Sequence, residues 1–125
     1  GTMRRHPDLV LNRHEGYIAK LAGFQKQLLT RATDWVKPGG FLCYAVCSLD
    51  PEEGEAQAKA FLETREDFRI VSPQNLSDLP VHLCQDNAFR STPADHPLAN
   101  HRYAGEVEKG GMDGFFAQVF QKISA

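Results

Sequence analysis

The sequence lacks an excess of charge of one sign, long apolar runs and a targeting segment. Its 125 residues hold 14 Lys and Arg against 16 Asp and Glu, a formal net charge of −2. That balance argues against nucleic-acid binding by bulk electrostatics, although a local basic patch is compatible with it. No apolar run approaches the roughly 20 residues that span a bilayer, and no signal segment stands at the start. We therefore expect no membrane partner.

Cysteine is also scarce. Cys43, Cys47 and Cys84 form an odd, irregularly spaced set, which is not the pattern of a disulfide framework and is typical of a reducing compartment. A content of 42% hydrophobic, 10% aromatic and 24% charged residues is that of a folded domain. These features predict a soluble cytoplasmic domain.

The clearest predicted element is a helix over residues 15–36. Apolar side chains recur there at three- and four-residue spacing, which predicts one buried helical face, formed by Ile18, Leu21, Ala22, Leu28, Leu29, Ala32, Trp35 and Val36. Pro38-Gly39-Gly40 predicts the end of this helix, because proline cannot continue it and glycine accepts the left-handed turn.

A strand and a second helix are predicted next. Residues 41–47 form a short apolar run with aromatic and branched side chains, which predicts a strand buried on both faces. Asp50 is the expected N-cap of the following helix, Pro51 its first residue and Glu53 the third position after the cap. This helix is expected to end near Arg65.

Further strands are predicted over residues 68–71 and 114–122. In the second, alternation assigns Phe115, Ala117 and Val119 to one face and Phe116, Gln118 and Phe120 to the other. Between them, residues 74–111 show no clean periodicity, and prolines and glycines interrupt them. The order helix, strand, helix, strand, loop, strand predicts an α/β fold with about three strands in a mixed sheet and two main helices. So thin a sheet is expected to be part of a larger one.

Cys47 is the leading candidate for chemistry. It ends a predicted strand just before a predicted helix, at the carboxyl edge of the sheet where open α/β sheets bind ligands. A helix N-terminus favours the thiolate and therefore nucleophilicity. The alternative is a small buried hydrophobe. Cys43 lies about 13 Å away along an extended strand, too far for a disulfide, and is expected to be a core residue.

Two further groups of polar residues bear on binding. Arg4, Arg5 and His6 form a short basic cluster that suits phosphate contacts, so it is the best available RNA-binding candidate; the alternative is a solvated loop. The scattered residues His82, Cys84, His96 and His101 lack any metal-ligand spacing, so no metal site is predicted.

Three segments together indicate a family. GTMRRHPD, KPGGFLCYAVCSLDPEEGE and GGMDGFFAQVF, in this order, resemble the C-terminal half of the Sun (Fmu) family of RNA (cytosine-5) methyltransferases. Residues 38–55 resemble the family's P-G-G-x-L-x-Y-x-x-C-S-x-x-P-E-E motif, and the last segment resembles its D-G-F-F strand. The resemblance covers nearly the whole chain and implies a Rossmann-like methyltransferase fold.

The resemblance implies a catalytic role for Cys47, which matches the cysteine of Y-x-x-C-S. In such enzymes this thiolate adds to C6 of a cytosine, C5 then takes a methyl group from S-adenosylmethionine, and loss of the C5 proton and of the thiol releases 5-methylcytosine. The target base is expected to leave its stack. Ribosomal RNA is the expected substrate, with transfer RNA second.

The resemblance also implies what this sequence omits. Residues 1–125 are expected to be the C-terminal part of the catalytic domain, with Gly1 and Thr2 native and the cofactor-binding residues upstream, so none is assigned here. The isolated chain is expected to be inactive and to associate through an exposed sheet edge. The alternatives are a non-catalytic RNA-binding or scaffold module and, less favoured by the strand geometry, a thiol-redox protein.

Overall fold

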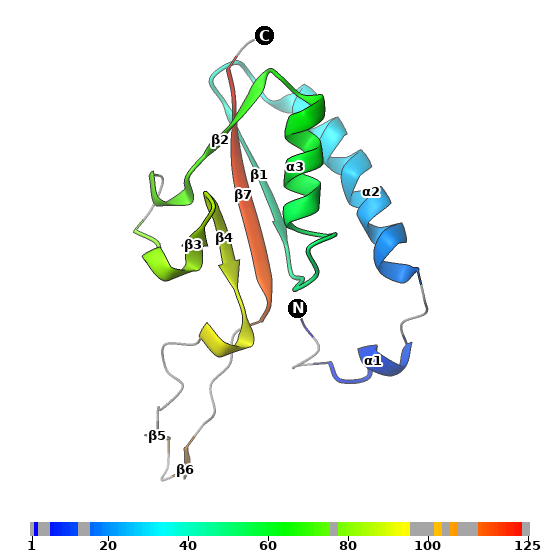
Figure 1. Cartoon of the computed structure of the whole chain (residues 1–125), viewed down its shortest axis with the longest axis vertical. Helices are drawn as coiled ribbons and strands as arrows, with labels where there is room; N and C mark the ends of the chain where they lie inside the picture. The colour runs from blue at the N-terminus through cyan, green and yellow to red at the C-terminus, as the bar shows by residue number, and fades with distance from the viewer. Residues whose placement is uncertain are drawn as a thin grey trace.

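The computed structural model describes residues 2, 6–12, 16–75, 78–95, 102–103, 106–107 and 113–123. The helices of this part are α1 (Leu9–Asn12), α2 (Tyr17–Ala32) and α3 (Glu55–Thr64). The strands are β1 (Phe41–Val46), β2 (Phe68–Val71), β3 (Cys84–Gln85), β4 (Ala88–Ser91), β5 (Arg102–Tyr103), β6 (Glu106–Val107) and β7 (Phe115–Lys122). Both long helices, α2 and α3, lie on the same side of the main sheet (Figure 1). No helix in the described ranges has the length and apolarity to cross a membrane.

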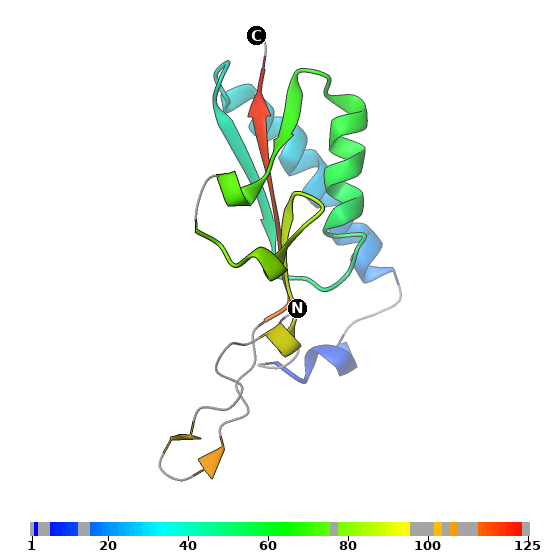
Figure 2. The same ribbon diagram turned by 60° about the vertical axis from the view of Figure 1, so that its left-hand side comes forward.

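The centre of the main sheet is β7. It pairs with β1 on one side; on the other it pairs with β2 toward its C-terminal end and with β4 toward its N-terminal end. β3 extends the sheet by pairing with β4, and β5 pairs with β6 in a separate two-stranded sheet. Figure 2 shows β7 running between β1 and the other strands. Strands distant in sequence thus meet on one segment.

The sheet differs from the predicted one in two respects. All strand pairings in the described part of the chain are antiparallel, whereas a mixed sheet of about three strands was expected. The hairpin of β3 and β4 was missed. Its two-residue turn consists of Asp86 and Asn87 at φ 49° and 62°, and Asp and Asn are among the residues that tolerate this left-handed conformation in tight hairpins.

The first predicted helix is confirmed as α2, but it is shorter than expected. It ends at Ala32 and continues as a 3₁₀ turn over Thr33–Trp35. Two residues assigned to its buried face are exposed, Leu28 at 52% and Trp35 at 82%. The tighter 3₁₀ winding moves Trp35 off the α-helical face, and Leu28 lines an open groove beside β1. The apolar spacing therefore predicted a longer and wider buried face than α2 has.

The two glycines that were predicted to end the helix lie in a turn beyond it. Gly39 has a left-handed φ of 79°, and Gly40 donates its N–H to the carbonyl of Lys37 at 2.8 Å. A Cβ at Gly40 would lie 2.8 Å from that same carbonyl oxygen. The glycine pair therefore forms the turn that leads into β1, rather than the cap of α2.

The second predicted helix begins later than expected. α3 starts at Glu55, and residues 51–54 form turns in front of it. The carboxylate of Asp50 accepts a hydrogen bond from the N–H of Glu52 at 2.9 Å, so it caps this turn and not the helix. Glu53 does not complete a capping box, because its carboxylate accepts hydrogen bonds from the side chains of Gln25 and Ser48 instead.

β1 is an edge strand with one exposed face, which contradicts the predicted burial on both faces. Its alternating side chains are half-buried at Leu42, Tyr44 and Val46 and exposed at Phe41, Cys43 and Ala45. Within the described ranges, β7 is the one strand paired with it. Cys43 is therefore not the core residue that was expected. Neighbouring atoms still desolvate its thiol partly, and this raises the thiol's pKa.

The core lies between the helices and the inner face of β7. Phe116 and Phe120 are exposed by only 1% and 0%, which confirms the predicted alternation of this strand. The ring of Phe61 on α3 packs against Phe120 at a centroid distance of 4.7 Å and against Phe68 of β2 at 5.3 Å. Leu29 of α2 joins this cluster. Burial of these aromatic rings holds both helices on the sheet.

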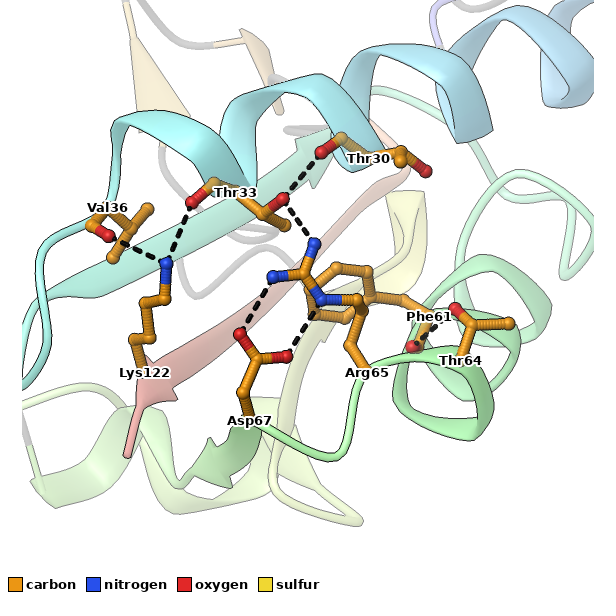
Figure 3. Close-up of polar contacts among 8 residues, drawn as sticks. All are labelled: Thr30, Thr33, Val36, Phe61, Thr64, Arg65, Asp67 and Lys122. Atoms are coloured by element: carbon orange, nitrogen blue, oxygen red, sulfur yellow. Dashed lines mark hydrogen bonds and ion pairs between the residues drawn. The ribbon is translucent and has the colours of Figure 1, made fainter. Parts of the chain in front are cut away.

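An arginine joins the ends of α2, α3 and β2 (Figure 3). Arg65 donates to both carboxylate oxygens of Asp67 at 2.8 and 2.7 Å and, through Nη1, to the hydroxyl of Thr33 at 2.5 Å. The fully buried Thr33 hydroxyl in turn donates to the carbonyl of Thr30 at 2.6 Å. The planar guanidinium fork thus satisfies a carboxylate and a buried hydroxyl together.

Lys122, at the end of β7, completes this junction from the other side (Figure 3). Its ammonium donates to the carbonyls of Thr33 at 3.4 Å and Val36 at 3.1 Å. The Thr33 carbonyl also accepts the N–H of Val36 at 3.3 Å, so the ammonium adds a second, charged donor where the helix ends. The chain's last strand is thereby tied to the end of its first long helix.

The Arg65–Asp67 pair makes the stability of the chain depend on pH. Hydrogen bonds from Arg65, aided by its charge, hold the pKa of Asp67 below its ordinary value. A lowered folded-state pKa stabilises the protein above the ordinary carboxyl pKa of about 4, and this contribution disappears as the pH falls through the folded-state value. Asp67→Asn should therefore cost about 1 kcal/mol at pH 7 and less in acid, measured by urea denaturation.

The adjacent exposed carboxylate provides the control for this prediction. Glu66→Gln removes the same charge one residue away, at a side chain exposed to solvent, whereas Asp67 is the carboxylate that Arg65 binds. Its effect on the free energy of unfolding should be small at both pH values. An Asp67→Asn penalty that stays constant from neutral pH to pH about 3 would contradict the assignment.

Candidate active site

Cys47 stands directly after the last residue of β1, Val46, which pairs with Phe116 of β7. Its side chain is exposed to solvent. The predicted position at the carboxyl end of the strand is therefore confirmed, whereas the alternative of a buried hydrophobe is wrong. An exposed thiol at this edge is accessible to a bulky substrate, as a nucleophile requires.

The residue that follows the thiol is fixed from several directions. Ser48 is 5% exposed. Its hydroxyl donates to a carboxylate oxygen of Glu53 at 2.6 Å and accepts from the N–H of Asp50 at 3.1 Å. Its carbonyl accepts from Nη1 of Arg90 at 2.5 Å. The backbone that carries the exposed Cys47 is thus held in one place by buried and partly buried polar contacts.

Glu53 anchors the same turn to α2 and β1. The carboxylate, in a residue only 4% exposed, also accepts from the amide of Gln25 at 2.9 Å. The Tyr44 hydroxyl donates to the backbone carbonyl of Glu53 at 2.5 Å. Burial, followed by the nearby Glu53 charge, raises the pKa of Tyr44 to about 12. The phenol therefore stays a hydrogen-bond donor at physiological pH.

Arg90 reaches the turn from β4. Besides the Ser48 carbonyl, it bonds both carboxylate oxygens of Glu55 at 2.9 and 2.5 Å, and its guanidinium lies 5.0 Å from the centre of the Phe116 ring. Gly54 makes room for it: a Cβ there would lie 2.6 Å from Nη2 of Arg90 and 3.1 Å from Cγ of Phe116. Only glycine leaves this approach open without displacing a neighbour.

The sequence makes Cys47 the candidate nucleophile, but it did not predict the residues that hold the turn after it. Arg90 lies in residues 74–111, for which no structure was predicted. Glu53 was interpreted as a helix-capping residue, so its contacts with Gln25 and Ser48 were not expected. One available signal was the single charged side chain of Arg90 between Phe89 and Ser91 in an otherwise uncharged strand. Such a residue needs a partner when its strand is covered.

The other candidate residues lie apart from this turn or outside the described residues. His6 is exposed, and its backbone N–H donates to the carbonyl of Thr2 at 3.0 Å. Arg4 and Arg5, the remaining members of the basic cluster, lie outside the described residues, as do His96 and His101. Cys84 is half-buried on β3.

No metal site is formed by the residues that the structure describes. They contain no group of three His, Cys, Asp or Glu side chains placed to hold a metal ion. The glycine pair Gly39 and Gly40 does not fit the methyl donor S-adenosylmethionine, because both N–H groups donate within the protein, to Lys122 and Lys37. The carboxylates of Asp50 and Glu53 are likewise engaged in the turn.

Comparisons with known proteins agree on one class of enzyme. A family model described as 16S rRNA methyltransferase RsmB/F matches residues 1–120. The ribosomal RNA small subunit methyltransferase B of Shewanella oneidensis is 37% identical over 105 residues, 83% of this chain and 23% of the relative. That of Vibrio cholerae is 46% identical over 71 residues, 57% of this chain and 16% of the relative.

A solved structure agrees with these matches. The crystal structure of a methyltransferase homolog protein from Pyrococcus horikoshii superimposes with a TM-score of 0.57 at 25% identity, over 88% of this chain and 33% of that one. The chain thus spans less than a quarter of the length of the two bacterial relatives and a third of the archaeal one.

Proposed function

Because the chain belongs to the 16S rRNA methyltransferase RsmB/F family, we propose that it carries the nucleophile of an enzyme that methylates C5 of a cytosine in small-subunit ribosomal RNA. One observation carries the proposal. Cys47 is exposed at the carboxyl end of β1, and the residue after it, Ser48, is held by one buried and one partly buried hydrogen bond. An accessible thiol on a rigid turn suits nucleophilic attack on a base.

The proposed chemistry is covalent catalysis. The Cys47 thiolate forms a bond to C6 of the cytosine, and the electron pair of the C5–C6 double bond makes C5 nucleophilic. After C5 has gained a methyl group, a base removes its proton, the double bond re-forms and the C6–S bond breaks, which releases the thiolate. C6 is accessible only in an unstacked base, so the enzyme is proposed to act on a flipped nucleotide.

The methyl donor and the RNA require residues beyond this turn. We propose S-adenosylmethionine as the methyl donor, held mostly by parts of the full-length protein outside this chain. The N–H groups of Gly39 and Gly40 and the carboxylates of Asp50 and Glu53 are already engaged within the protein, which supports this proposal. Arg4, Arg5 and His6 are proposed to contact RNA phosphates, with ribosomal RNA favoured over transfer RNA. We accordingly propose a cytoplasmic location for the enzyme.

Bisulfite mapping of small-subunit ribosomal RNA tests this function. Cells that lack the full-length gene should lose the protection of one cytosine from deamination, and the intact gene should restore it. A gene that encodes Cys47→Ser should fail to restore it. An unchanged map after deletion would contradict the proposal, and restoration by the Cys47→Ser gene would favour a non-catalytic RNA-binding or scaffold role.

The unpaired edge of β1 leads to a separate prediction about this chain alone. β1 has no charged side chain, its exposed face includes Phe41 and Cys43, and its second edge pairs with no strand in the described ranges. Such edges pair with other chains. We expect concentration-dependent self-association in analytical ultracentrifugation, reduced by Ala45→Lys on β1 and not by Ala19→Lys on α2. A monomer at all concentrations would contradict it.

A further inference from the structure

We infer that Arg90 is a positioning residue for the Cys47 nucleophile and that the β3–β4 hairpin serves to deliver it. This inference rests on the proposed function, since it assigns Arg90 a role in the reaction of Cys47. Arg90 would touch neither RNA nor methyl donor. It would act through the backbone of Ser48, the residue joined to Cys47 by a peptide bond.

The contacts of Arg90 are directional and involve three of its nitrogens. Nη1 donates to the Ser48 carbonyl at 2.5 Å, while Nε and Nη2 donate to the two oxygens of Glu55 at 2.9 and 2.5 Å. The face of the guanidinium lies 5.0 Å from the centre of the buried Phe116 ring. A guanidinium group that is hydrogen-bonded through three nitrogens and stacked on an aromatic ring has little freedom to move. The Ser48 carbonyl therefore has a fixed partner.

Stability alone does not account for this arrangement. The Glu55 side chain is 52% exposed, and an ion pair so open to solvent contributes little to the free energy of unfolding. The contact with most consequence is the one to the Ser48 carbonyl, because it fixes the direction of the backbone just after β1. The Ser48 hydroxyl is held by Glu53, so a buried and a partly buried contact together define the turn.

The topology explains why the arginine comes from the hairpin. Arg90 pairs in register with Phe116, which itself pairs with Val46, the residue before Cys47. β7 thus places β4 and the end of β1 on its two sides at the same level. From this position a long side chain crosses β7 to the Ser48 carbonyl, and Gly54 leaves the space for its head group.

Steady-state methylation of 16S ribosomal RNA by the full-length protein tests the inference. Arg90→Ala should lower kcat about 100-fold, because a displacement of about 1 Å at a reacting group has a cost of this size, while KM for RNA changes less than about threefold. Arg90→Lys keeps the charge without the fork and should recover part of kcat. Added guanidinium ion should raise the kcat of Arg90→Ala and leave Cys47→Ser inactive.

Arg69→Ala is the matched control. Arg69 lies on β2, is exposed and bonds to Gln121, so its loss should change kcat less than about twofold.

A wild-type kcat in Arg90→Ala would overturn the inference, as would an effect confined to KM for RNA. Should Arg90→Ala fail to fold, Arg90→Lys and Glu55→Gln carry the same test. Activity in Cys47→Ser would overturn the proposed function itself, whereas an inactive Cys47→Ser beside a fully active Arg90→Ala overturns the inference alone.

Discussion

Cys47→Ser in the full-length protein is expected to reduce RNA methylation on the order of 10⁴-fold or more, because a serine hydroxyl is a far weaker nucleophile than a thiolate at neutral pH. The exposed position of Cys47 means that the substitution removes little packing. Folding should therefore be preserved. The measurement is transfer of labelled methyl groups to 16S ribosomal RNA, with circular dichroism to verify the fold.

Two other cysteines provide matched controls. Cys43 is exposed on β1, four residues before Cys47, and Cys84 is half-buried on β3. Cys43→Ser should leave the methylation rate within about twofold, since exposed substitutions away from a site cost little. Cys84→Ser should affect stability more than the rate, because it places a hydroxyl at a partly buried position.

A trapped adduct gives an independent readout of the same prediction. RNA with 5-fluorocytosine at the target position carries a fluorine where the final proton would leave, so the covalent intermediate should accumulate. Mass spectrometry of the digested adduct should place the RNA on Cys47. An adduct on Cys43 or Cys84, or wild-type activity of Cys47→Ser, would overturn the assignment.

Phe120→Ala is expected to lower the free energy of unfolding by about 3–5 kcal/mol, the usual cost of removing a buried phenylalanine ring. Phe120 is fully buried in the C-terminal half of β7, packs against Phe61 and lies between Leu42 of β1 and Ile70 of β2 in the sheet register. A loss of this size is a large share of the roughly 5–15 kcal/mol that small domains possess. Urea denaturation followed by circular dichroism measures it.

Phe24→Ala is the control for this loss. Phe24 lies on α2 and is 59% exposed, so the same change of side chain should cost less than about 0.5 kcal/mol. Phe120→Leu keeps most of the volume and should cost less than about 1.5 kcal/mol, which preserves a measurable transition if Phe120→Ala does not fold. Equal costs for Phe24→Ala and Phe120→Ala would contradict the place of β7 at the centre of the core.

The sequence by itself determined the features that depend on neighbouring residues. Apolar spacing located α2, and the strict alternation of residues 115–122 assigned Phe116, Gln118 and Phe120 to one face of β7 correctly. The motif around Cys47 placed the thiol at the end of a strand, and the family match over residues 1–120 confirms the resemblance to RNA methyltransferases. Periodicity and motif spacing are local properties, so one chain suffices to identify them.

The tertiary structure alone decided which contacts surround the thiol. The partner of Ser48 is Arg90, 42 residues later, and it comes from a hairpin with no periodic pattern. The sequence predicted that the carboxylate of Glu53 caps the next helix. In the structure this carboxylate instead accepts a hydrogen bond from Gln25, 28 residues earlier. Pairing with β7 likewise made β1 an edge strand with an exposed face. Each outcome depends on segments that meet only after folding, because hydrogen bonds and burial depend on distance in space and not along the chain.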